Sequence, residues 1–208
     1  MTETEAERIE QAIAGDPAAL DRLLLDSYEP LTAHIGAQLP ADLRRLIGVD
    51  DIVQLVYSQA FRGIREFEVR GDGCWISWLK AISDNRIRDA LRAERAKKRG
   101  GDFRQLISVG KEGSPFVESL VGEYATTTAT PSREVARGEA IKAIQVAIAG
   151  LPEENREVVQ LRYFEDCPVD EIARRLDKSP GAVRGLLDRS KQKIRESLQS
   201  ASRYLSSR

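Results

Sequence analysis

The sequence of 208 residues holds few of the residue types on which enzyme active sites and metal centres depend. It contains one histidine, His34, and two cysteines, Cys74 and Cys167. The cysteines lie far apart and have neither a CxxC spacing nor a nearby histidine, which excludes a disulfide framework and a local metal site. Chemistry that needs a histidine base or ligand would depend on His34 alone, which we interpret as an ordinary helix residue.

Phosphate-binding loops are also missing. The sequence has no GxxxxGK[ST] string and no GxGxxG turn, and the nearest string, GKEGS at 110–114, has the wrong spacing. Acidic residues and histidines do not cluster in the pattern that a nuclease or phosphotransferase needs, which counts against this enzyme alternative. We therefore expect a protein that is not an enzyme and that carries no cofactor or metal.

Long apolar runs are absent as well. No run approaches the ~20 residues that a membrane span requires, and the start, MTETEAERIE, is acidic where a secretory signal would be basic and then apolar. The composition of 41% hydrophobic and 31% charged residues supports a buried core under an ionic surface. These features predict a soluble, cytoplasmic protein with no membrane insertion.

Charge is unevenly distributed along a chain whose net charge is only -1. Residues 1–30 hold eight acidic residues against two arginines, a net charge of -6. The segments 86–99 and 178–208 carry net charges of +5 and +6. Because a polyanion responds to local charge, two basic segments predict two contacts with a nucleic acid. The alternative is that both are solvated helix faces.

The chain divides by composition into three parts. Residues 100–131 contain five glycines and two prolines together with the string TTTATPS, and they follow neither a helical nor a strand period. The only helix that the pattern allows there is a short one over Phe116–Val121. We expect helical domains over 1–99 and 136–208, joined by a flexible linker over 100–135.

Both outer parts follow a helical period, so the predicted fold class is all-α, with two small helical domains. Asp16 and Pro17 are suited to begin a first helix, and Pro30 should interrupt or kink it. A helix over 51–64 would place five apolar or small residues on one face: Val53, Tyr57, Ala60, Phe61 and Ile64. Its other face would present Asp51, Gln54, Leu55, Ser58 and Arg62.

The next predicted helix, from Trp75 to about Arg95, follows a glycine-containing loop. One face of this helix is aromatic at its start and polar further along. It comprises Trp75, Trp78, Ile82, Asn85, Asp89 and Arg92. Aromatic rings beside cations suit single-stranded nucleic acid, because bases stack on the rings while the cations hold phosphates. The alternative is that both tryptophans belong to the core.

The segment 168–198 predicts a helix-turn-helix. A helix over Val169–Leu176 would be followed by a short turn, Asp177 and Lys178, and by a second helix with Ser179 as N-cap and Pro180 in its first turn. The N-terminal end of the second helix would enter the major groove of DNA, with Lys178, Arg184 and Arg189 exposed. An ordinary helical hairpin is the alternative.

Two segments carry a resemblance to a known family. DDIVQLVYSQAFRGIREF followed by WISWLKAISDNRIRDALR resembles region two of bacterial RNA polymerase sigma factors of the extracytoplasmic-function (ECF) type. LPEENREVVQLRYFEDCPVDEIARRLDKSPGAVRGLLDRSKQKIRE resembles region four of the same family. The order and separation of the segments match, and no helical domain lies between them, as in this compact type of sigma factor.

The resemblance implies a function and a set of site residues. Core RNA polymerase would dock on Asp51, Gln54, Leu55, Ser58 and Arg62. The melted minus-ten element would be captured by Arg70, Asp72, Trp75, Asn85, Arg88 and Arg92. The minus-thirty-five duplex would be bound by Lys178, Ser179, Arg184 and Arg189. The expected partners are core polymerase, promoter DNA and an anti-sigma factor, and the free factor is expected to be a monomer.

One other class of protein has the same helix-turn-helix. In a stand-alone transcription regulator, the C-terminal part would bind operators as a dimer while the N-terminal part senses a signal. That class requires a dimer interface and a ligand pocket, whereas the polar face over 51–62 is typical of a docking surface. We therefore favour the sigma-factor interpretation.

Overall fold

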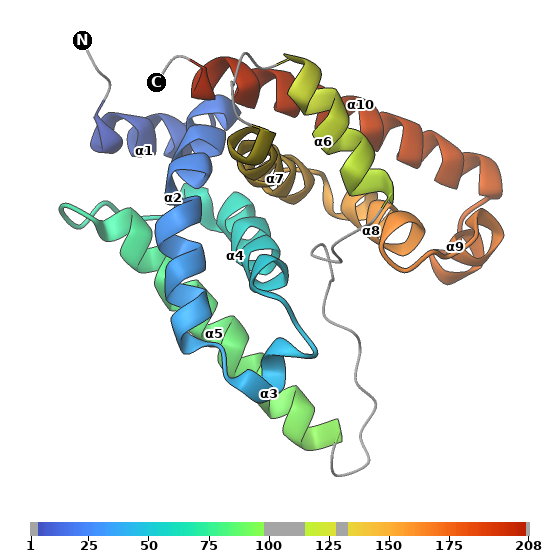
Figure 1. The fold of residues 1–208 in the computed structure, drawn as a ribbon, viewed down its shortest axis with the longest axis horizontal. Coiled ribbons are helices and arrows are strands. Elements are labelled where there is room, and N and C mark those ends of the chain that lie inside the picture. Colours follow the sequence, from blue (N-terminus) through green and yellow to red (C-terminus); the bar gives the residue numbers. More distant parts are fainter. Residues whose placement is uncertain (1–3, 98–114, 128–132, 207–208) are drawn as a thin grey trace. The chain divides into compact units, whose positions relative to one another are not determined.

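The computed structural model describes residues 4–97, 115–127 and 133–206, and every regular element in this part of the chain is a helix (Figure 1). The all-α prediction is therefore confirmed. The chain divides near residue 110 into two compact units. We call the described residues before this division unit 1 and those after it unit 2. None of the described helices combines the length and the apolar character that a membrane crossing needs.

Unit 1 is built from five α-helices and one 3₁₀ turn. They are α1 (Glu5–Ile13), α2 (Pro17–Gln38), α3 (Ala41–Arg44), α4 (Val49–Gly63), η1 (Ile64–Glu66) and α5 (Cys74–Lys97). As predicted, Asp16 caps α2: its carboxylate accepts from Ala18 N at 2.9 Å, and Pro17 opens the helix. The helix then continues through Pro30 without a break, so the expected interruption is absent.

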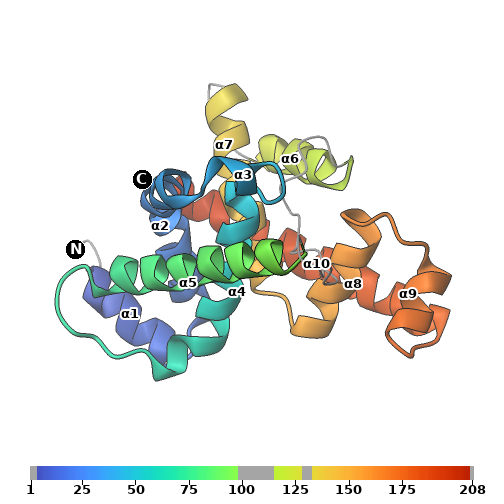
Figure 2. The same ribbon diagram turned by 90° about the horizontal axis from the view of Figure 1, so that it is seen from below.

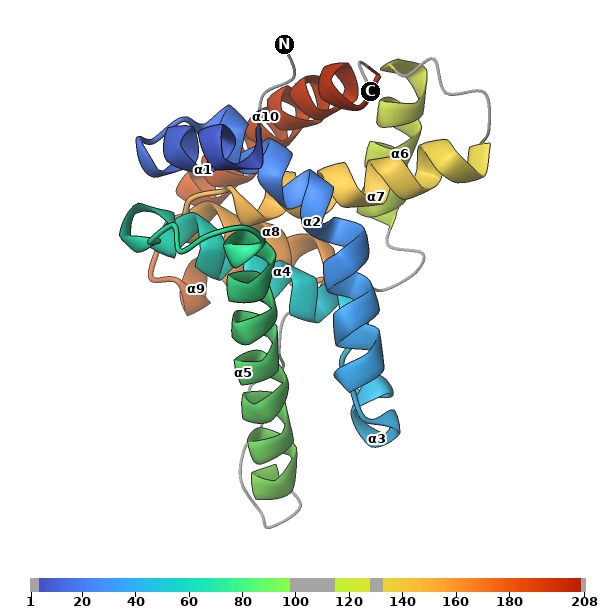
Figure 3. The same ribbon diagram turned by 90° about the vertical axis from the view of Figure 1, so that its left-hand side faces the viewer.

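The core of unit 1 forms where α2, α4 and α5 pack against one another (Figure 3). Its fully buried side chains include Leu24, Leu31, Tyr57 and Leu79. The Tyr57 hydroxyl donates to the Leu24 carbonyl at 2.6 Å, and burial raises the pKa of this hydroxyl well above its ordinary value. On the inner face predicted for 51–64, Val53, Tyr57, Ala60 and Ile64 are buried, whereas Phe61 is only partly buried.

Unit 2 consists of α6 (Pro115–Thr127), α7 (Arg133–Ala149), α8 (Glu153–Tyr163), α9 (Val169–Arg175) and α10 (Pro180–Leu205). Buried apolar residues of α8, α9 and α10 form one cluster, which includes Val158, Ile172, Val183 and Leu187. Two short turns connect these helices, and in each an aspartate adopts a left-handed backbone: Asp166 has φ 54° and Asp177 has φ 52°. Aspartate tolerates this conformation better than most residues.

The predicted helix-turn-helix is present, with α9 and the start of α10 at one end of unit 2 (Figure 2). The turn is closed by a bond from Lys178 N to the Ala173 carbonyl at 2.8 Å. Ser179 then caps α10, because its hydroxyl accepts from Ala182 N at 3.1 Å, and Pro180 occupies the first turn. The cap fixes where the second helix of the motif begins.

Helix α6 lies within the span that the sequence analysis assigned to a flexible linker. It is longer than the short helix considered there, and it packs against α7 and α10. Leu120 and Tyr124 are its buried residues. The sequence pattern is weak here because Gly122 and two threonines favour helix poorly. Contacts with the rest of unit 2 therefore supply most of the stability of α6.

Charged and aromatic groups hold α6 in place. Glu118 pairs with the Arg137 guanidinium through both carboxylate oxygens, at 2.9 and 2.7 Å. Glu123 accepts from Arg195 Nε at 2.9 Å. The Phe116 ring stacks on Tyr163 with centroids 4.0 Å apart and planes 11° apart. Beside this stack lies a pocket of about 330 Å³, so the seam between α6 and the rest of unit 2 is incompletely filled.

Weakening the two ion pairs should release α6. We expect Glu118→Gln/Glu123→Gln to lose hydrogen-exchange protection in 115–127 while α8–α10 keep theirs, because α6 depends on these contacts. Raising salt from about 0.1 M to about 1 M should produce the same change in the unaltered protein. Glu134→Gln, which removes an exposed charge from α7, is the matched control. Unchanged protection in the double variant would contradict this account.

Low pH should weaken the contact between Glu118 and Arg137 and so destabilise α6. The hydrogen bond from Arg137 lowers the pKa of Glu118 below its ordinary value of 4.5. A lowered carboxyl pKa contributes stability above the ordinary value, and that contribution is lost as the pH falls through the lowered one. After correction for the intrinsic pH dependence of amide exchange, the protection of α6 should therefore fall below about pH 4, and Glu118→Gln should reduce this loss.

Candidate nucleic-acid interfaces

The loop before α5 brings the chain into that helix through two glycines. Gly71 and Gly73 adopt φ of +102° and +68°, a region that other residues rarely occupy. The Ser77 hydroxyl then bonds the Gly73 carbonyl at 2.8 Å. Arg70 and Asp72, both predicted to contact the minus-ten element, are exposed in this loop. Arg70 pairs with Glu68 within the loop, at 2.6 Å from Nη2 to Oε2.

Trp75 occupies a different environment from the one its predicted role requires. Its side chain is only 2% exposed, and its indole Nε1 donates to the Ser27 hydroxyl on α2 at 2.8 Å. A ring packed on both faces cannot stack on a base, so this part of the prediction is corrected: Trp75 is a core residue. A helical period cannot make the distinction, because the core and nucleic-acid stripes of α5 are adjacent.

Trp78 lies one turn further along α5 and is half-buried. Its ring is 4.9 Å from that of Phe67 and 5.4 Å from that of Trp75, measured between centroids. Gly63 on α4 faces the Trp78 ring, and a methyl group at that position would come within 3.4 Å of it. The aromatic cluster thus joins the loop, α4 and α5, and gives the start of α5 a rigid base.

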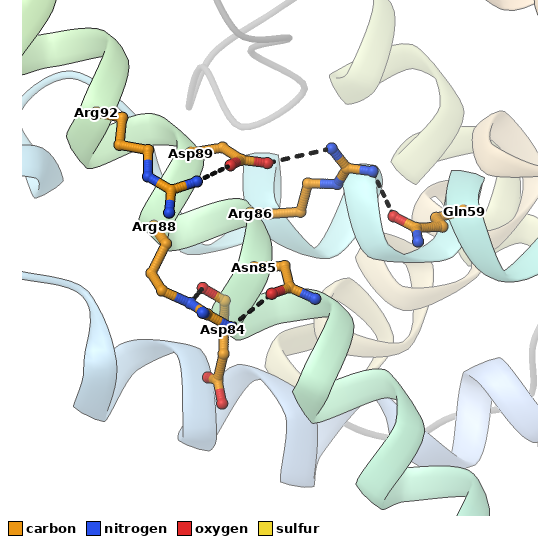
Figure 4. Close-up of polar contacts among 7 residues, drawn as sticks. All are labelled: Gln59, Asp84, Asn85, Arg86, Arg88, Asp89 and Arg92. Atoms are coloured by element: carbon orange, nitrogen blue, oxygen red, sulfur yellow. Dashed lines mark hydrogen bonds and ion pairs between the residues drawn. The ribbon is translucent and has the colours of Figure 1, made fainter.

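The polar half of α5 brings together three of the predicted site residues, shown in Figure 4. Asn85, Arg88 and Arg92 are all exposed. Arg88 donates to the Asn85 side-chain oxygen at 2.5 Å and to the Asp84 carbonyl at 3.2 Å. The bond from Arg88 leaves the Asn85 amide nitrogen free to donate. The exposed face therefore offers this amide beside the guanidinium groups of Arg88 and Arg92. Such a face can bind phosphate groups and the edge of an unpaired base.

Further residues at this face were not identified from the sequence. Arg86 donates to Gln59 on α4, and its guanidinium lies 3.7 Å from Asp89. His34 on α2 lies 2.8 Å from Asp84, measured from Nε2 to Oδ1. His34 is therefore a helix residue, as expected, and it also connects α2 to α5. These contacts join residues distant in the sequence, which no local pattern reveals.

The face of α4 predicted to bind polymerase lies opposite its core-facing residues. Asp51 accepts a bond from Gly48 N at 2.7 Å and so also caps the helix. Gln54 and Ser58 are buried, and no described residue gives their side chains a hydrogen bond. Leu55 is partly buried and Arg62 is exposed. Asp51, Gln54 and Ser58 are thus buried in this structure, and the exposed part of the predicted docking face is Arg62 with the partly buried Leu55.

The predicted minus-thirty-five residues gather at the start of α10. Arg184 and Arg189 are exposed, and the Arg189 guanidinium folds over Gly185, where an added methyl group would come within 3.3 Å of it. Ser179 caps the helix. Lys178 forms an ion pair with Glu154 on α8, so part of its charge is already neutralised. The free amides and positive dipole of the helix start add to the attraction for phosphate.

Comparisons with known proteins find relatives over most of the chain. The family described as sigma-70, region 4, matches residues 141–194, which include the helix-turn-helix. The RNA polymerase sigma-H factor of Pseudomonas aeruginosa is 27% identical over 198 residues, which is 95% of each chain. The ECF RNA polymerase sigma-E factors of Haemophilus influenzae and Escherichia coli K12 are 25% and 22% identical. Each covers 94% of this chain, and the matches span 96% and 95% of those relatives.

These relatives align with almost the whole chain, and the region that the family description matches runs from within α7 to within α10 and so includes the helix-turn-helix of unit 2. The protein is an ECF-type RNA polymerase sigma factor with a sigma-70 region 4 in its C-terminal part.

Proposed function

We propose that the two units divide promoter recognition between them. Unit 1 docks on core RNA polymerase through α4 and holds the melted minus-ten strand on α5, while unit 2 binds the minus-thirty-five duplex with the start of α10. The observation that carries this proposal is the convergence of Asn85, Arg88 and Arg92 on one exposed face of α5. As a sigma factor, the protein directs the polymerase to promoters and is not itself an enzyme.

Two weak DNA interfaces are enough for promoter binding because both are held on one polymerase. Each unit alone binds DNA weakly, but on one polymerase the second contact becomes intramolecular and has a high effective concentration. The spacing of the two promoter elements then becomes part of the specificity. The net charge of -1 also supports this division, because a nearly neutral factor is captured less by nonspecific DNA.

We further infer that the free factor is a monomer, that an anti-sigma factor restrains it, and that it works in the cytoplasm with the polymerase. A two-fold operator requires a dimeric reader, whereas a polymerase subunit contributes one copy of each reading surface. Sedimentation of the free protein distinguishes these arrangements, since a stable dimer would favour the stand-alone regulator.

Capture of core polymerase tests the docking face. We expect the unaltered protein to bind purified bacterial core enzyme and Asp51→Ala/Gln54→Ala to bind it at least tenfold more weakly, which corresponds to about 1.4 kcal/mol. Asp51 also caps α4, and loss of that cap costs about 1 kcal/mol of stability. Gln54→Ala/Arg62→Ala leaves the cap in place and is therefore the matched variant.

The two variants separate docking from folding. Weak capture of Gln54→Ala/Arg62→Ala, together with an unchanged free energy of unfolding, supports docking on this face of α4, because Gln54 is itself buried. Weak capture of the first alone, together with a lowered free energy of unfolding, attributes the effect to the cap. If the unaltered protein fails to bind core polymerase, the proposal is wrong.

A further inference from the structure

An acidic residue lies within the cationic face of α5. One carboxylate oxygen of Asp89 accepts from Arg92 Nη1 at 3.4 Å, and the other lies 3.7 Å from Arg86 Nη1 (Figure 4). The three residues are spaced three apart in the sequence, so they follow one another along the helix surface. Asp89 thus partly neutralises Arg86 and Arg92, two cations that would otherwise attract phosphate.

Asp89 is placed by a contact with another helix. Arg86 is about one-third exposed, and it donates to the side-chain oxygen of Gln59 on α4. This bond directs the Arg86 guanidinium along the surface of α5, with one nitrogen on Gln59 and the other toward Asp89. Arg86 therefore serves as a positioning residue, and it joins the helix that we propose docks on polymerase to the helix that we propose reads DNA.

The ion pair between Asp89 and Arg92 contributes little to stability and can exchange its carboxylate for a phosphate. The Asp89 side chain is 54% exposed and that of Arg92 is 76% exposed, and ion pairs so open to water contribute little to folding. A phosphate oxygen and a carboxylate oxygen compete for the same guanidinium donors. A phosphate that approaches Arg92 therefore competes with Asp89 for the guanidinium, and this competition lowers the affinity for DNA.

We propose that Asp89 is a specificity-determining residue. In the free factor its carboxylate binds the Arg92 guanidinium where a DNA phosphate would bind, and only a correctly placed DNA strand replaces it. This inference depends on the proposed minus-ten role of α5. Weak binding to the DNA phosphates favours discrimination between promoter and other sequences, because phosphate contacts carry no sequence information. A strand that also satisfies Asn85 gains enough to displace Asp89, whereas a random strand does not.

A double-mutant cycle tests this proposal. The probe is a fluorescent oligothymidine of about 20 nucleotides, bound to the free full-length protein at several salt concentrations. We expect Asp89→Asn to tighten binding about two- to fivefold. Arg92→Ala should weaken binding and reduce the salt dependence by about one phosphate contact. In the Arg92→Ala background, Asp89→Asn should give a clearly smaller gain.

The controls separate release of Arg92 from a general change in charge. Asp42→Asn removes one exposed acid from α3, and it should leave the affinity within about a factor of 1.5. An equal gain from Asp89→Asn in both backgrounds would overturn the proposal. If Arg92→Ala has no effect, the minus-ten role of Arg92 is wrong. If Arg92→Ala weakens binding but Asp89→Asn does not strengthen it, only the role of Asp89 is wrong.

Discussion

Replacing Trp75 with alanine is expected to lower the free energy of unfolding of unit 1 by about 3–5 kcal/mol, because the change removes a large buried ring and leaves a cavity. It also leaves the Ser27 hydroxyl without its donor, the indole Nε1 at 2.8 Å. The sequence contains two tryptophans, Trp75 and Trp78, and both lie in unit 1. Urea unfolding followed by tryptophan fluorescence therefore reports on this unit alone.

Two further variants show which role Trp75 has. Trp75→Phe keeps most of the ring and should cost only about 1–3 kcal/mol. Trp78→Ala should cost less than Trp75→Ala, because Trp78 is already half-exposed. Unchanged stability of Trp75→Ala, together with lost promoter opening, would restore Trp75 to the nucleic-acid interface and contradict its place in the core.

The second large effect is expected at the start of α10. Arg184→Ala/Arg189→Ala should weaken binding of the minus-thirty-five duplex by polymerase holoenzyme at least about 30-fold, since each lost arginine contact is worth about 1–3 kcal/mol and the two together at least about 2 kcal/mol. The two side chains are separated by about 140° around the helix, so one can reach base edges while the other holds phosphate. The loss should therefore include a smaller salt dependence.

Single variants assign the two roles. The arginine that contacts a base should relax specificity when it is removed, whereas the one that contacts phosphate should weaken all sequences equally. Arg203→Ala is the control, because this exposed arginine lies about 20 Å further along the same helix. If the control weakens binding as much as the double variant does, general charge and not the helix start attracts the DNA.

Local chemistry made the helix-turn-helix predictable. Ser179 and Pro180 mark a helix start from their own preferences, and Val183 and Leu187 continue the apolar period. Likewise, Val53, Tyr57 and Ala60 identify the inner face of α4 from spacing alone. These features could be predicted because neighbouring residues determine them.

Features that depend on distant partners could not be predicted. Trp75 is buried because Ser27, 48 positions earlier, accepts its hydrogen bond. Helix α6 is stabilised by burial of Leu120 and Tyr124 against the rest of unit 2, and Arg137 and Arg195 pair with its two glutamates. The sequence of 115–127 does not identify those partners. Asp89 and Arg92 share a stripe in the sequence, but the bond from Arg86 to Gln59 required α4 and α5 to be packed together.

Helix α6 also determines how much chain can stretch between the two reading surfaces. With α6 attached to unit 2, 17 residues (98–114) separate the end of α5 from the next anchored residue, and such a length spans at most about 60 Å. Detachment of α6 would extend the tether to 35 residues (98–132) before α7, which span at most about 120 Å. A promoter whose two elements are too far apart for the shorter segment would thus become accessible only after α6 leaves unit 2, which breaks two glutamate–arginine contacts and exposes Leu120 and Tyr124.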